Sequence, residues 1–337
     1  MIRRQLLLIV FATLTGAALA QGPAGTGQYY MTADGKSGAE LKTALNAILL
    51  PHVQRTYGEL WTDFGSTDLR PDGYVWDMYS CVTSYVLGDD QNRGTTGPEG
   101  TNYNREHSMP NSWFNKEYPM YTDLHHMYPT DSYVNNRRGN EPFGEVSNPT
   151  WQSAEGFSKL GPARDGLGYQ GTVFEPADEY KGDFARTYFY MVTAYETYTT
   201  PQGQEHRVAS WNSPMLAQNQ YPALTDWAVK MLLRWSEEDP VSDKETQRNE
   251  AVWQIQQNRN PFIDYPGLEQ YIWGSKQGEP FSYDGSQTEG ICEWTADSRQ
   301  PAAVWYDLQG RKTVKPAKRG VYVKKHRNRK GRIVTAD

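Results

Sequence analysis

The chain has 337 residues, enough for one large domain or two smaller ones, and a formal net charge of −6 at pH 7. The charge is unevenly spread: residues 297–337 carry twelve Lys or Arg against three acids, which leaves the preceding part strongly acidic. The two cysteines cannot supply a structural zinc site by themselves, and no stretch of the chain is long and apolar enough to span a membrane.

Residues 1–20 have the three parts of a secretory signal peptide. Two arginines form its charged start, residues 6–12 its apolar core, and residues 18–20 a cleavage site of small residues. We therefore expect a soluble protein that uses the export machinery and is secreted, whether extracellular, periplasmic or at the cell surface. Export would allow Cys81 and Cys292 to form a disulfide, and the alternative is two free thiols.

The mature chain is predicted to begin with a mobile, glycine-rich segment and then a helix over Ser37–Tyr57. Leucine and isoleucine recur at helical spacing between residues 41 and 49, and the proline at position 51 breaks or kinks the helix. The segment Leu60–Gly88 is rich in aromatic residues and aspartate, and a polar loop over residues 89–102 leads to the next stretch.

The stretch Asn104–Phe143 is the densest in groups that can do chemistry, and it holds three of the six histidines. We predict a strand over Tyr103–Met109, a loop over Asn111–Thr122, a second strand over Asp123–Tyr128, and then a short helix. Thr130, Asp131 or Ser132 can cap that helix, and Gly139 ends it. In the second strand, alternation would send His125 and His126 to opposite faces.

The predicted ββα order brings the end of the first strand against the helix, so that Glu106 and His107 can face Asn135. A neutral imidazole can take a proton from water near pH 7, and a carboxylate with an amide oxygen suits a hard cation such as Mg²⁺. This grouping suits hydrolysis of a phosphodiester with the help of one divalent metal. The plainer alternative for a His-Glu pair alone is an ordinary polar pair at the surface.

The rest of the body is predicted to be mainly helical. A loop and a helix are expected within Phe174–Tyr198, with Phe184, Tyr188, Met191 and Tyr195 on one face. Further helices are expected over Leu216–Trp235 and from Asp239 to about Gln257. Many helices and few strands indicate an α+β domain built around one ββα unit. Residues 277–301 are expected to be a linker.

The basic C-terminal segment alternates like short strands separated by glycine turns. We expect residues 21–290 to form the main domain and residues 300–337 a short β-type tail. The tail resembles those that serve as sorting signals, and sorting or attachment is its expected role. Binding of nucleic acid or of an anionic cell surface is the alternative.

Three motifs carry a resemblance to a known family: NREHSMPNSW, DLHHMYPTDSYVNNRRGN and FEPADEYKGDFARTYFYM. They resemble the endonuclease I family of secreted bacterial nucleases, which belongs to the ββα-metal or His-Me finger nucleases, and the likeness runs from about Leu60 to Trp273. The resemblance implies a ββα-metal finger embedded in a mostly helical domain. It also implies His107 as the general base and Glu106 and Asn135 as ligands of Mg²⁺, or of another divalent cation such as Mn²⁺ or Ca²⁺.

The resemblance leaves the group that holds the cleaved phosphate open. Some relatives use an arginine from the loop between the two strands, and here no arginine lies between His107 and Asp123. The candidates are Arg105, Arg137, Arg138 and Arg186, of which Arg138 and Arg186 are taken as catalytic together with His107. His126, Asn140 and Arg105 are expected to support the base and the metal ligands, His126 by a hydrogen bond that fixes the strand or the base.

The expected function is that of a secreted, metal-dependent and largely sequence-nonspecific endonuclease that cuts DNA, and RNA as a second substrate, to 5′-phosphate and 3′-hydroxyl ends. It is expected to act as a monomer, with weak affinity and no base readout because its body is acidic. One alternative is a phosphodiesterase for small nucleotides or cell-wall phosphates. Another is a non-catalytic surface adhesin, against which the intact Glu106, His107 and Asn135 speak.

Overall fold

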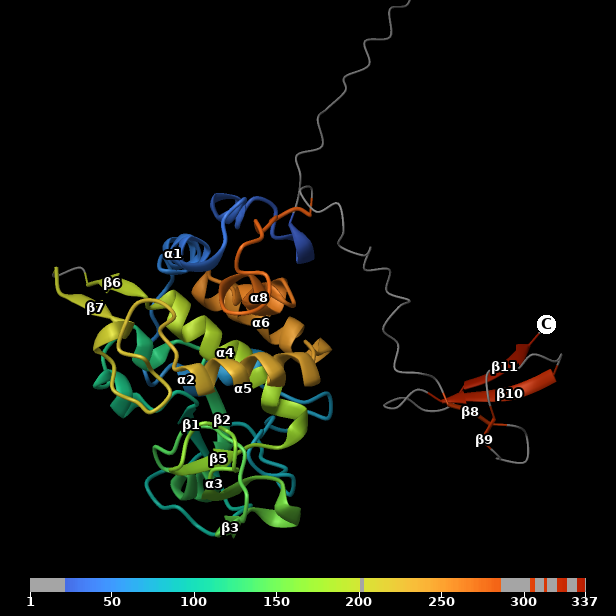
Figure 1. The fold of residues 1–337 in the computed structure, drawn as a ribbon. Helices are drawn as coiled ribbons and strands as arrows, with labels where there is room; N and C mark the ends of the chain where they lie inside the picture. Colours follow the sequence, from blue (N-terminus) through green and yellow to red (C-terminus); the bar gives the residue numbers. More distant parts are fainter. Residues whose placement is uncertain are drawn as a thin grey trace, which may run out of the picture. The chain divides into compact units, whose positions relative to one another are not determined.

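The computed structural model describes residues 22–200 and 203–285, and the strand residues 304–306, 312–313, 320–325 and 332–336. It divides the chain into two compact units, Met1–Gln287 and Thr288–Asp337. The larger unit is drawn with the strands of the smaller one in Figure 1. The predicted signal peptide, Cys292 and most of the predicted linker lie outside the described residues.

The larger unit is an α+β fold, as predicted. Its helices are α1 (Gly38–Leu49), α2 (Leu60–Thr67), α3 (Ser132–Arg138), α4 (Lys181–Ala194), α5 (Asp226–Glu238), α6 (Asp243–Gln256), α7 (Pro261–Asp264) and α8 (Leu268–Ile272). Its strands are β1 (Tyr103–His107), β2 (Met127–Asp131), β3 (Trp151–Gln152), β4 (Lys159–Pro162), β5 (Thr172–Glu175), β6 (Thr197–Thr199) and β7 (Glu205–Arg207). Short 3-10 helices are η1 (Pro23–Gly25), η2 (Met31–Ala33), η3 (Asn111–Phe114), η4 (Met120–Thr122), η5 (Ala154–Gly156), η6 (Asp178–Tyr180) and η7 (Val208–Ser210).

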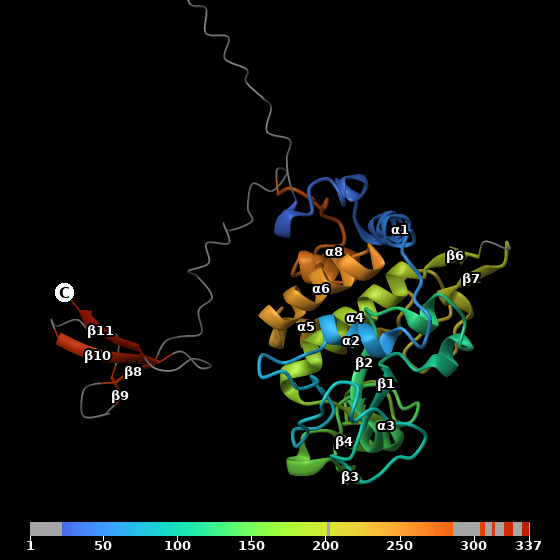
Figure 2. The same cartoon turned by 180° about the vertical axis from the view of Figure 1, so that it is seen from behind.

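The helix α4 is the centre of the core, because all of its residues are buried. It packs against α1, α5 and α7. The front and back views show it running through the middle of the unit, with α1, α6 and α8 towards one end and α3 with β3–β5 towards the other (Figures 1 and 2). The face predicted from Phe184, Tyr188, Met191 and Tyr195 is buried, but so is the rest of the helix.

The predicted ββα unit is present. β1 pairs antiparallel with β2, with Tyr103 opposite Asp131 and His107 opposite Met127, and α3 follows β2 directly. Asp131 caps α3, since its side chain accepts from the backbone N–H of Val134 at 2.8 Å, and Gly139 ends the helix at a φ of 60°. The unit is therefore fixed at both ends of its helix.

The second strand begins later than predicted, at Met127 rather than Asp123. Asp123 stands in a tight turn, where its carboxylate accepts from the backbone N–H of His125 at 2.9 Å and from the hydroxyls of Tyr190 and Tyr195 at 2.7 and 2.6 Å. The expectation that His125 and His126 lie on opposite faces of a strand is therefore wrong, because neither residue is in a strand.

Two predicted helices are shorter than expected. α1 ends at Leu49, just before the proline at position 51, and the chain then runs irregularly to α2, which was not predicted. α5 starts only at Asp226, because the chain around Pro222 folds back on itself with a backbone hydrogen bond of 2.9 Å from Ala217 to Ala223. Proline lacks the N–H that a helix interior needs. The predicted end of α6 near Gln257 is confirmed.

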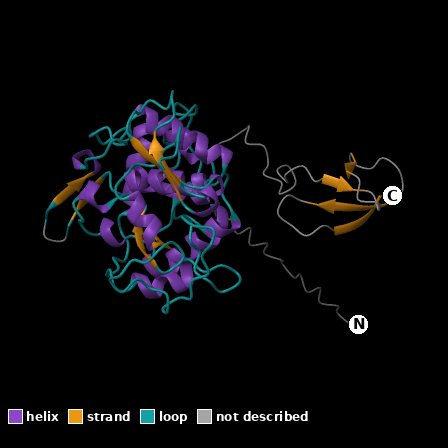
Figure 3. Ribbon diagram, turned by 90° about the horizontal axis from the view of Figure 1, so that it is seen from below, coloured by secondary structure: helices purple, strands orange, loops and turns teal. Residues whose placement is uncertain are grey.

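The larger unit contains two further small sheets, neither of which was predicted. β3, β4 and β5 form a three-stranded antiparallel sheet, and β6 pairs with β7. Figure 3 shows these strands as short pieces among predominant helices. Within the described residues no helix is long and apolar enough to cross a membrane.

The smaller unit contains an antiparallel sheet in the order β11-β10-β8-β9. Its strands are β8 (Val304–Tyr306), β9 (Lys312–Thr313), β10 (Gly320–Lys325) and β11 (Arg332–Ala336). Strands were expected near β8 and β10 from the alternation of the sequence, whereas β9 and β11 were not foreseen.

Candidate active site

Glu106 is a buried carboxylate near the end of β1. Its Oε1 accepts from Nη1 of Arg138 at 2.6 Å and from the hydroxyl of Tyr79 at 3.0 Å. Burial raises the pKa of Glu106, and the positive charge of Arg138 and these hydrogen bonds oppose that rise. The carboxylate is thus held in one orientation by two fixed donors.

Arg138 is buried at the end of α3 and serves this carboxylate. Besides Glu106, its Nη2 donates to the carbonyl of Ser108 at 2.7 Å, and its guanidinium lies 4.1 Å from the centre of the Phe143 ring. With only 1% of the residue exposed, Arg138 does not reach a substrate phosphate. The expectation that Arg138 contacts the cleaved phosphate is therefore corrected: it orients Glu106 from behind.

Asn135 reaches the same carboxylate from α3. Its side chain is close enough to Glu106 to be one of the groups that lower the pKa of that carboxyl. Its Nδ2 donates to Oδ1 of Asn104 at 2.9 Å. Because Nδ2 is engaged in this way, Oδ1 of Asn135 is the atom left to accept or to coordinate. Glu106 and Asn135 are thus brought together, as the ββα order predicted.

The hydrogen bonds of His107 define its tautomer. Nε2 lies 2.9 Å from the backbone carbonyl of Tyr121, and Nδ1 lies 3.1 Å from Nδ2 of Asn111. A carbonyl oxygen can only accept, so Nε2 carries the proton and Nδ1 presents a lone pair, to which the Asn111 amide donates. Burial lowers the pKa of His107 to about 3, so the ring is neutral at pH 7.

His126 supports the same loop. Its Nε2 lies 2.6 Å from the carbonyl of Met120, the residue before the one that His107 contacts. Its buried Nδ1 has no hydrogen-bond partner in the part of the chain that the structure describes. The two imidazoles, whose centres are 5.6 Å apart, therefore hold consecutive carbonyls of one loop. The expected hydrogen bond of His126 exists, but it fixes the loop, and no hydrogen bond joins His126 to His107 among the described residues.

Aromatic rings enclose His107. The Tyr57 ring stacks on it at 5.9 Å with an angle of 16°, and the Tyr121 ring lies 4.7 Å away. Arg105 also packs against the Tyr57 ring. Its guanidinium carbon lies 3.5 Å from the centre of the Tyr57 ring and 4.2 Å from the centre of the Trp61 ring. The positive charge of Arg105 is one of the influences that lower the pKa of His107, although burial is the largest.

Glu106 and His107 are neighbours in one strand but belong to separate hydrogen-bonded groups. Glu106 is hydrogen-bonded to Arg138 and Tyr79, with Asn135 close by, whereas His107 is hydrogen-bonded to the loop after β1. In the described part of the chain no group of three or more His, Cys, Asp or Glu side chains is placed to hold a metal ion. Any metal at this site would therefore have few protein ligands, one carboxylate and one amide among them.

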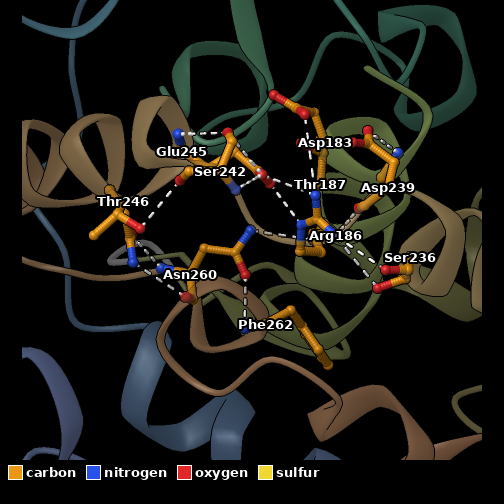
Figure 4. Close-up of polar contacts among 12 residues, drawn as sticks. Asp183, Arg186, Thr187, Ser236, Asp239, Ser242, Glu245, Thr246, Asn260 and Phe262 are labelled. Atoms are coloured by element: carbon orange, nitrogen blue, oxygen red, sulfur yellow. Dashed lines mark hydrogen bonds and ion pairs between the residues drawn. The ribbon is translucent and has the colours of Figure 1, made fainter. Parts of the chain in front are cut away.

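Arg186 lies in a different network and is corrected as a catalytic candidate. It is almost completely buried and forms a two-pronged ion pair with Glu245, with Nε–Oε1 and Nη2–Oε2 distances of 2.5 and 2.8 Å (Figure 4). Its Nη1 donates to the backbone carbonyl of Asp239 at 2.8 Å. Arg186 thus ties α4 to α6 and the end of α5, and it is not available to a phosphate.

The remaining positively charged side chains near the site are exposed, but they differ in their contacts. Arg137 is exposed on α3 and lies against the Trp151 ring, 5.3 Å from its centre. Lys116 is exposed in the loop after β1, and its charge also acts on His107. Sequence reasoning sought an arginine there and passed over this lysine. Asn140 is exposed just after α3, beyond the contacts that orient Glu106.

Several partners were missed for a common reason. Tyr79 and Tyr57 come from segments that precede β1 by more than twenty residues, and Asn111 binds His107 through its position at the start of η3. Tyr57 and Tyr79 lie in none of the three motifs, and Asn111 lies in NREHSMPNSW but was not singled out. The one available signal was that Asn111 follows His107 by only four residues in the sequence. A short loop can bring the chain back beside the strand that it has just left, so Asn111 could have been expected near His107.

Comparison with known proteins identifies the class and then the family. Residues 37–267 match the family described as Endonuclease I. The chain is 33% identical to an extracellular ribonuclease of Bacillus amyloliquefaciens over 264 residues, which cover 77% of this chain and 82% of the relative. It is also 33% identical to an extracellular ribonuclease of Bacillus subtilis (strain 168) over 263 residues, covering 77% and 83%. With Endonuclease-1 of Buchnera aphidicola subsp. Acyrthosiphon pisum (strain APS), identity is 24% over 142 residues, covering 42% and 44%.

These matches define a nuclease, a hydrolase whose substrate is nucleic acid. The chain belongs to the Endonuclease I family. The resemblance inferred from the three sequence motifs is thereby confirmed, and the match begins further towards the N-terminus than Leu60, where the likeness was expected to start.

Proposed function

We propose that the protein is a secreted, metal-dependent and sequence-tolerant endonuclease that hydrolyses DNA and RNA to 5′-phosphate and 3′-hydroxyl ends. One observation carries this proposal. The oxygen-bearing side chains of Glu106 and Asn135 lie close together, and a neutral His107 follows Glu106 directly in the same strand. Secretion is supported by the signal-like residues 1–20 and by the similarity to two extracellular ribonucleases.

A hard divalent cation such as Mg²⁺ fits the donors at this site. Glu106 is a carboxylate whose orientation is already fixed by Arg138. The side-chain nitrogen of Asn135 is bonded to Asn104, and the side-chain oxygen of Asn135 takes no part in that bond. Mg²⁺ binds through one or two such oxygens and otherwise keeps waters and substrate phosphate. Bound there, the cation would stabilise negative charge on the phosphate and on the leaving oxygen. Mn²⁺ and Ca²⁺ share this preference for oxygen and are the alternatives.

His107 would act as the general base through Nδ1. The carbonyl of Tyr121 keeps the proton on Nε2, so Nδ1 holds the lone pair. A water that replaces the Asn111 amide at Nδ1 can then give its proton to Nδ1 without a change of tautomer. The resulting hydroxide attacks phosphorus, the bond to the 3′ oxygen breaks, and the 3′ oxygen ends as a hydroxyl after protonation. The imidazolium that forms is stabilised by the negative phosphate, which offsets the burial that keeps the free ring neutral.

Arg105 and Lys116 are the cations best suited to attract the phosphate. Both act electrostatically on His107, and neither forms an ion pair with a carboxylate among the described residues. Arg138 and Arg186 are already committed to Glu106 and Glu245. Few phosphate contacts in an acidic body favour weak, sequence-tolerant binding, since affinity for nucleic acid comes mostly from such contacts.

Incubation with supercoiled plasmid and with a long single-stranded RNA, each with Mg²⁺ or with chelator, tests the proposal. Relaxation and then degradation of the plasmid with Mg²⁺, and none with chelator, is the expected result. Cleavage of RNA alone would remove DNA from the proposal. Cleavage of short dinucleotides with intact plasmid would favour a phosphodiesterase for small nucleotides, and undiminished cleavage in chelator would refute the metal.

A further inference from the structure

Three tyrosine rings form a continuous row that ends at His107. The rings of Tyr118 and Tyr121 are 5.3 Å apart, and those of Tyr121 and Tyr57 are 4.9 Å apart. Tyr121 and Tyr57 each contact the His107 ring, at 4.7 and 5.9 Å. We call Tyr118, Tyr121 and Tyr57 the tyrosine row.

The row leads from solvent to the buried imidazole. Tyr118 is 42% exposed, Tyr121 and Tyr57 are half-buried, and His107 is buried. A large aromatic side chain gains little from exposure, so an exposed ring that is linked to a candidate catalytic group through one neighbouring ring is a candidate for contact with a ligand. The exposed end of the row has the shape and chemistry of a surface on which a flat aromatic group can stack.

The loop that carries Tyr118 is held in place on both sides. Trp113 and Phe114 anchor its start in the core, and the carboxylate of Glu117 contacts Nδ1 of His206 in β7. The backbone N–H of Tyr121 donates to the carbonyl of Glu117 at 2.9 Å. The ring of Tyr118 is therefore presented on a fixed backbone and loses little freedom when a ligand binds.

Charge favours a stacking contact over further phosphate contacts. Residues 21–296 carry twenty Lys or Arg against 37 Asp or Glu, so this part of the chain offers little general attraction to a polyanion. Base stacking on aromatic side chains does not depend on phosphate neutralisation, and it tolerates any sequence because every base has an aromatic face. In an intact duplex the bases are stacked on one another, so only an unpaired base can use such a surface.

We propose that Tyr118 stacks on an unpaired base next to the cleaved phosphate, so that the enzyme favours single-stranded nucleic acid over intact duplex. This proposal rests on the proposed nuclease function and names the form of the substrate that the same site prefers. Tyr121 contacts Tyr118 and is itself packed against Tyr57, so these two rings link the position of Tyr118 to the surroundings of His107.

The test compares kcat/KM of the full-length protein on a labelled single strand and on a hairpin duplex of the same sequence. Tyr118→Ala should raise KM for the single strand about five- to tenfold, near the lower end of what removal of a base-stacking aromatic produces, with kcat nearly unchanged. Duplex cleavage should stay the same, and Tyr118→Phe should behave like the unaltered protein. Tyr74→Ala is the matched control, since Tyr74 is 38% exposed and is absent from the row.

A strand with one abasic position sharpens the test. The unaltered protein should leave a gap in the cleavage ladder at the phosphate beside the missing base, and Tyr118→Ala should lessen that gap. An equal loss on single strand and duplex, or an unchanged gap, would overturn the stacking proposal while leaving the nuclease function intact. Absence of cleavage by the unaltered protein would instead count against the nuclease function, and fluorescence anisotropy of the same strands would then still decide whether Tyr118 binds a base.

Discussion

Replacing Arg138 by methionine should destabilise the protein strongly and should do so through Glu106. Arg138 is buried, and Glu106 is buried with it, so the change leaves a carboxylate in the interior without its positive partner. The guanidinium also donates to the Ser108 carbonyl, at 2.7 Å, and its loss leaves that carbonyl with the hydroxyl of Tyr188 where it had two donors. Methionine has a similar length and fills much of the same space, so the loss comes mainly from charge and hydrogen bonding.

The expected cost follows from the burial of the pair. Removing one partner of a buried ion pair costs about 3–5 kcal/mol, because the other charge stays desolvated. For a unit of this size that corresponds to a fall in Tm of roughly 6–12 °C. Arg137→Met is the matched control, since Arg137 neighbours Arg138 on α3 but is exposed, and its substitution should change the free energy of unfolding by about 0.5 kcal/mol or less.

The pH dependence identifies Glu106 as the cause. Burial already raises the pKa of Glu106, and loss of Arg138 raises it further. A carboxyl whose pKa is higher in the folded state than in the unfolded state destabilises the protein wherever it has to ionise. The loss of stability is absent at a pH below both pKa values, and it grows as the pH rises from the unfolded-state pKa towards the folded-state pKa. The deficit of Arg138→Met in urea unfolding should therefore be smaller at pH 4 than at pH 8.

A double-mutant cycle with Glu106→Gln completes this test. The glutamine removes the charge while keeping the shape, so Arg138→Met should cost clearly less in that background. Equal costs in both backgrounds, or an Arg138→Met protein as stable as Arg137→Met, would refute the reasoning that Arg138 acts by holding a buried carboxylate.

Three further predictions concern the proposed chemistry. Glu106→Ala and Asn135→Ala should each raise the Mg²⁺ concentration needed for half-maximal cleavage, because each removes an oxygen from a site with few protein ligands. The activity of both variants should partly recover at high Mg²⁺. An unchanged Mg²⁺ titration in both variants would show that the metal binds elsewhere. The acid limb of the pH–rate profile should shift to lower pH as Mg²⁺ rises, since proton and cation compete for Glu106, whose pKa burial raises, whereas a limb independent of Mg²⁺ would argue against that ligand. End-labelling of a cut duplex should give 5′-phosphate and 3′-hydroxyl ends, and 3′-phosphate ends would rule out the proposed attack by water with departure of the 3′ oxygen.

The ββα unit was predictable from sequence because local signals marked it. The first strand was predicted to run to Met109, before Pro110, and β1 ends two residues earlier, at His107. Asp131 and Gly139 mark the two ends of α3. These signals act through backbone geometry and capping within a few residues, so they can be recognised without knowledge of the rest of the fold. The pairing of Glu106 with Asn135 followed from the same order of elements.

The errors arose where distant contacts override local pattern. Asp123 leaves the predicted strand because the hydroxyls of Tyr190 and Tyr195, far along the chain, hold it in a turn. Arg186 looked suited to a phosphate because it lies near the start of a helix, but Glu245 pairs with it from α6. Neither partner leaves a signal in the local sequence, since both depend on how helices pack.

The arrangement around His107 shows the same limit. The strand and the histidine were predictable, but the proton position depends on the carbonyl of Tyr121 and the amide of Asn111, which come from the loop's folded path. The tyrosine row likewise joins Tyr57, from before the ββα unit, to Tyr118 in the loop. Only the assembled structure brings these rings together.

The central claim is that His107 activates water at a metal-dependent site, and single-turnover cleavage by His107→Ala tests it most directly. With Mg²⁺ saturating and binding of a labelled strand followed separately by anisotropy, the variant should cleave about 10²–10⁴-fold more slowly while it binds strand and metal as before. Cleavage at a near-normal rate with binding intact would contradict the claim.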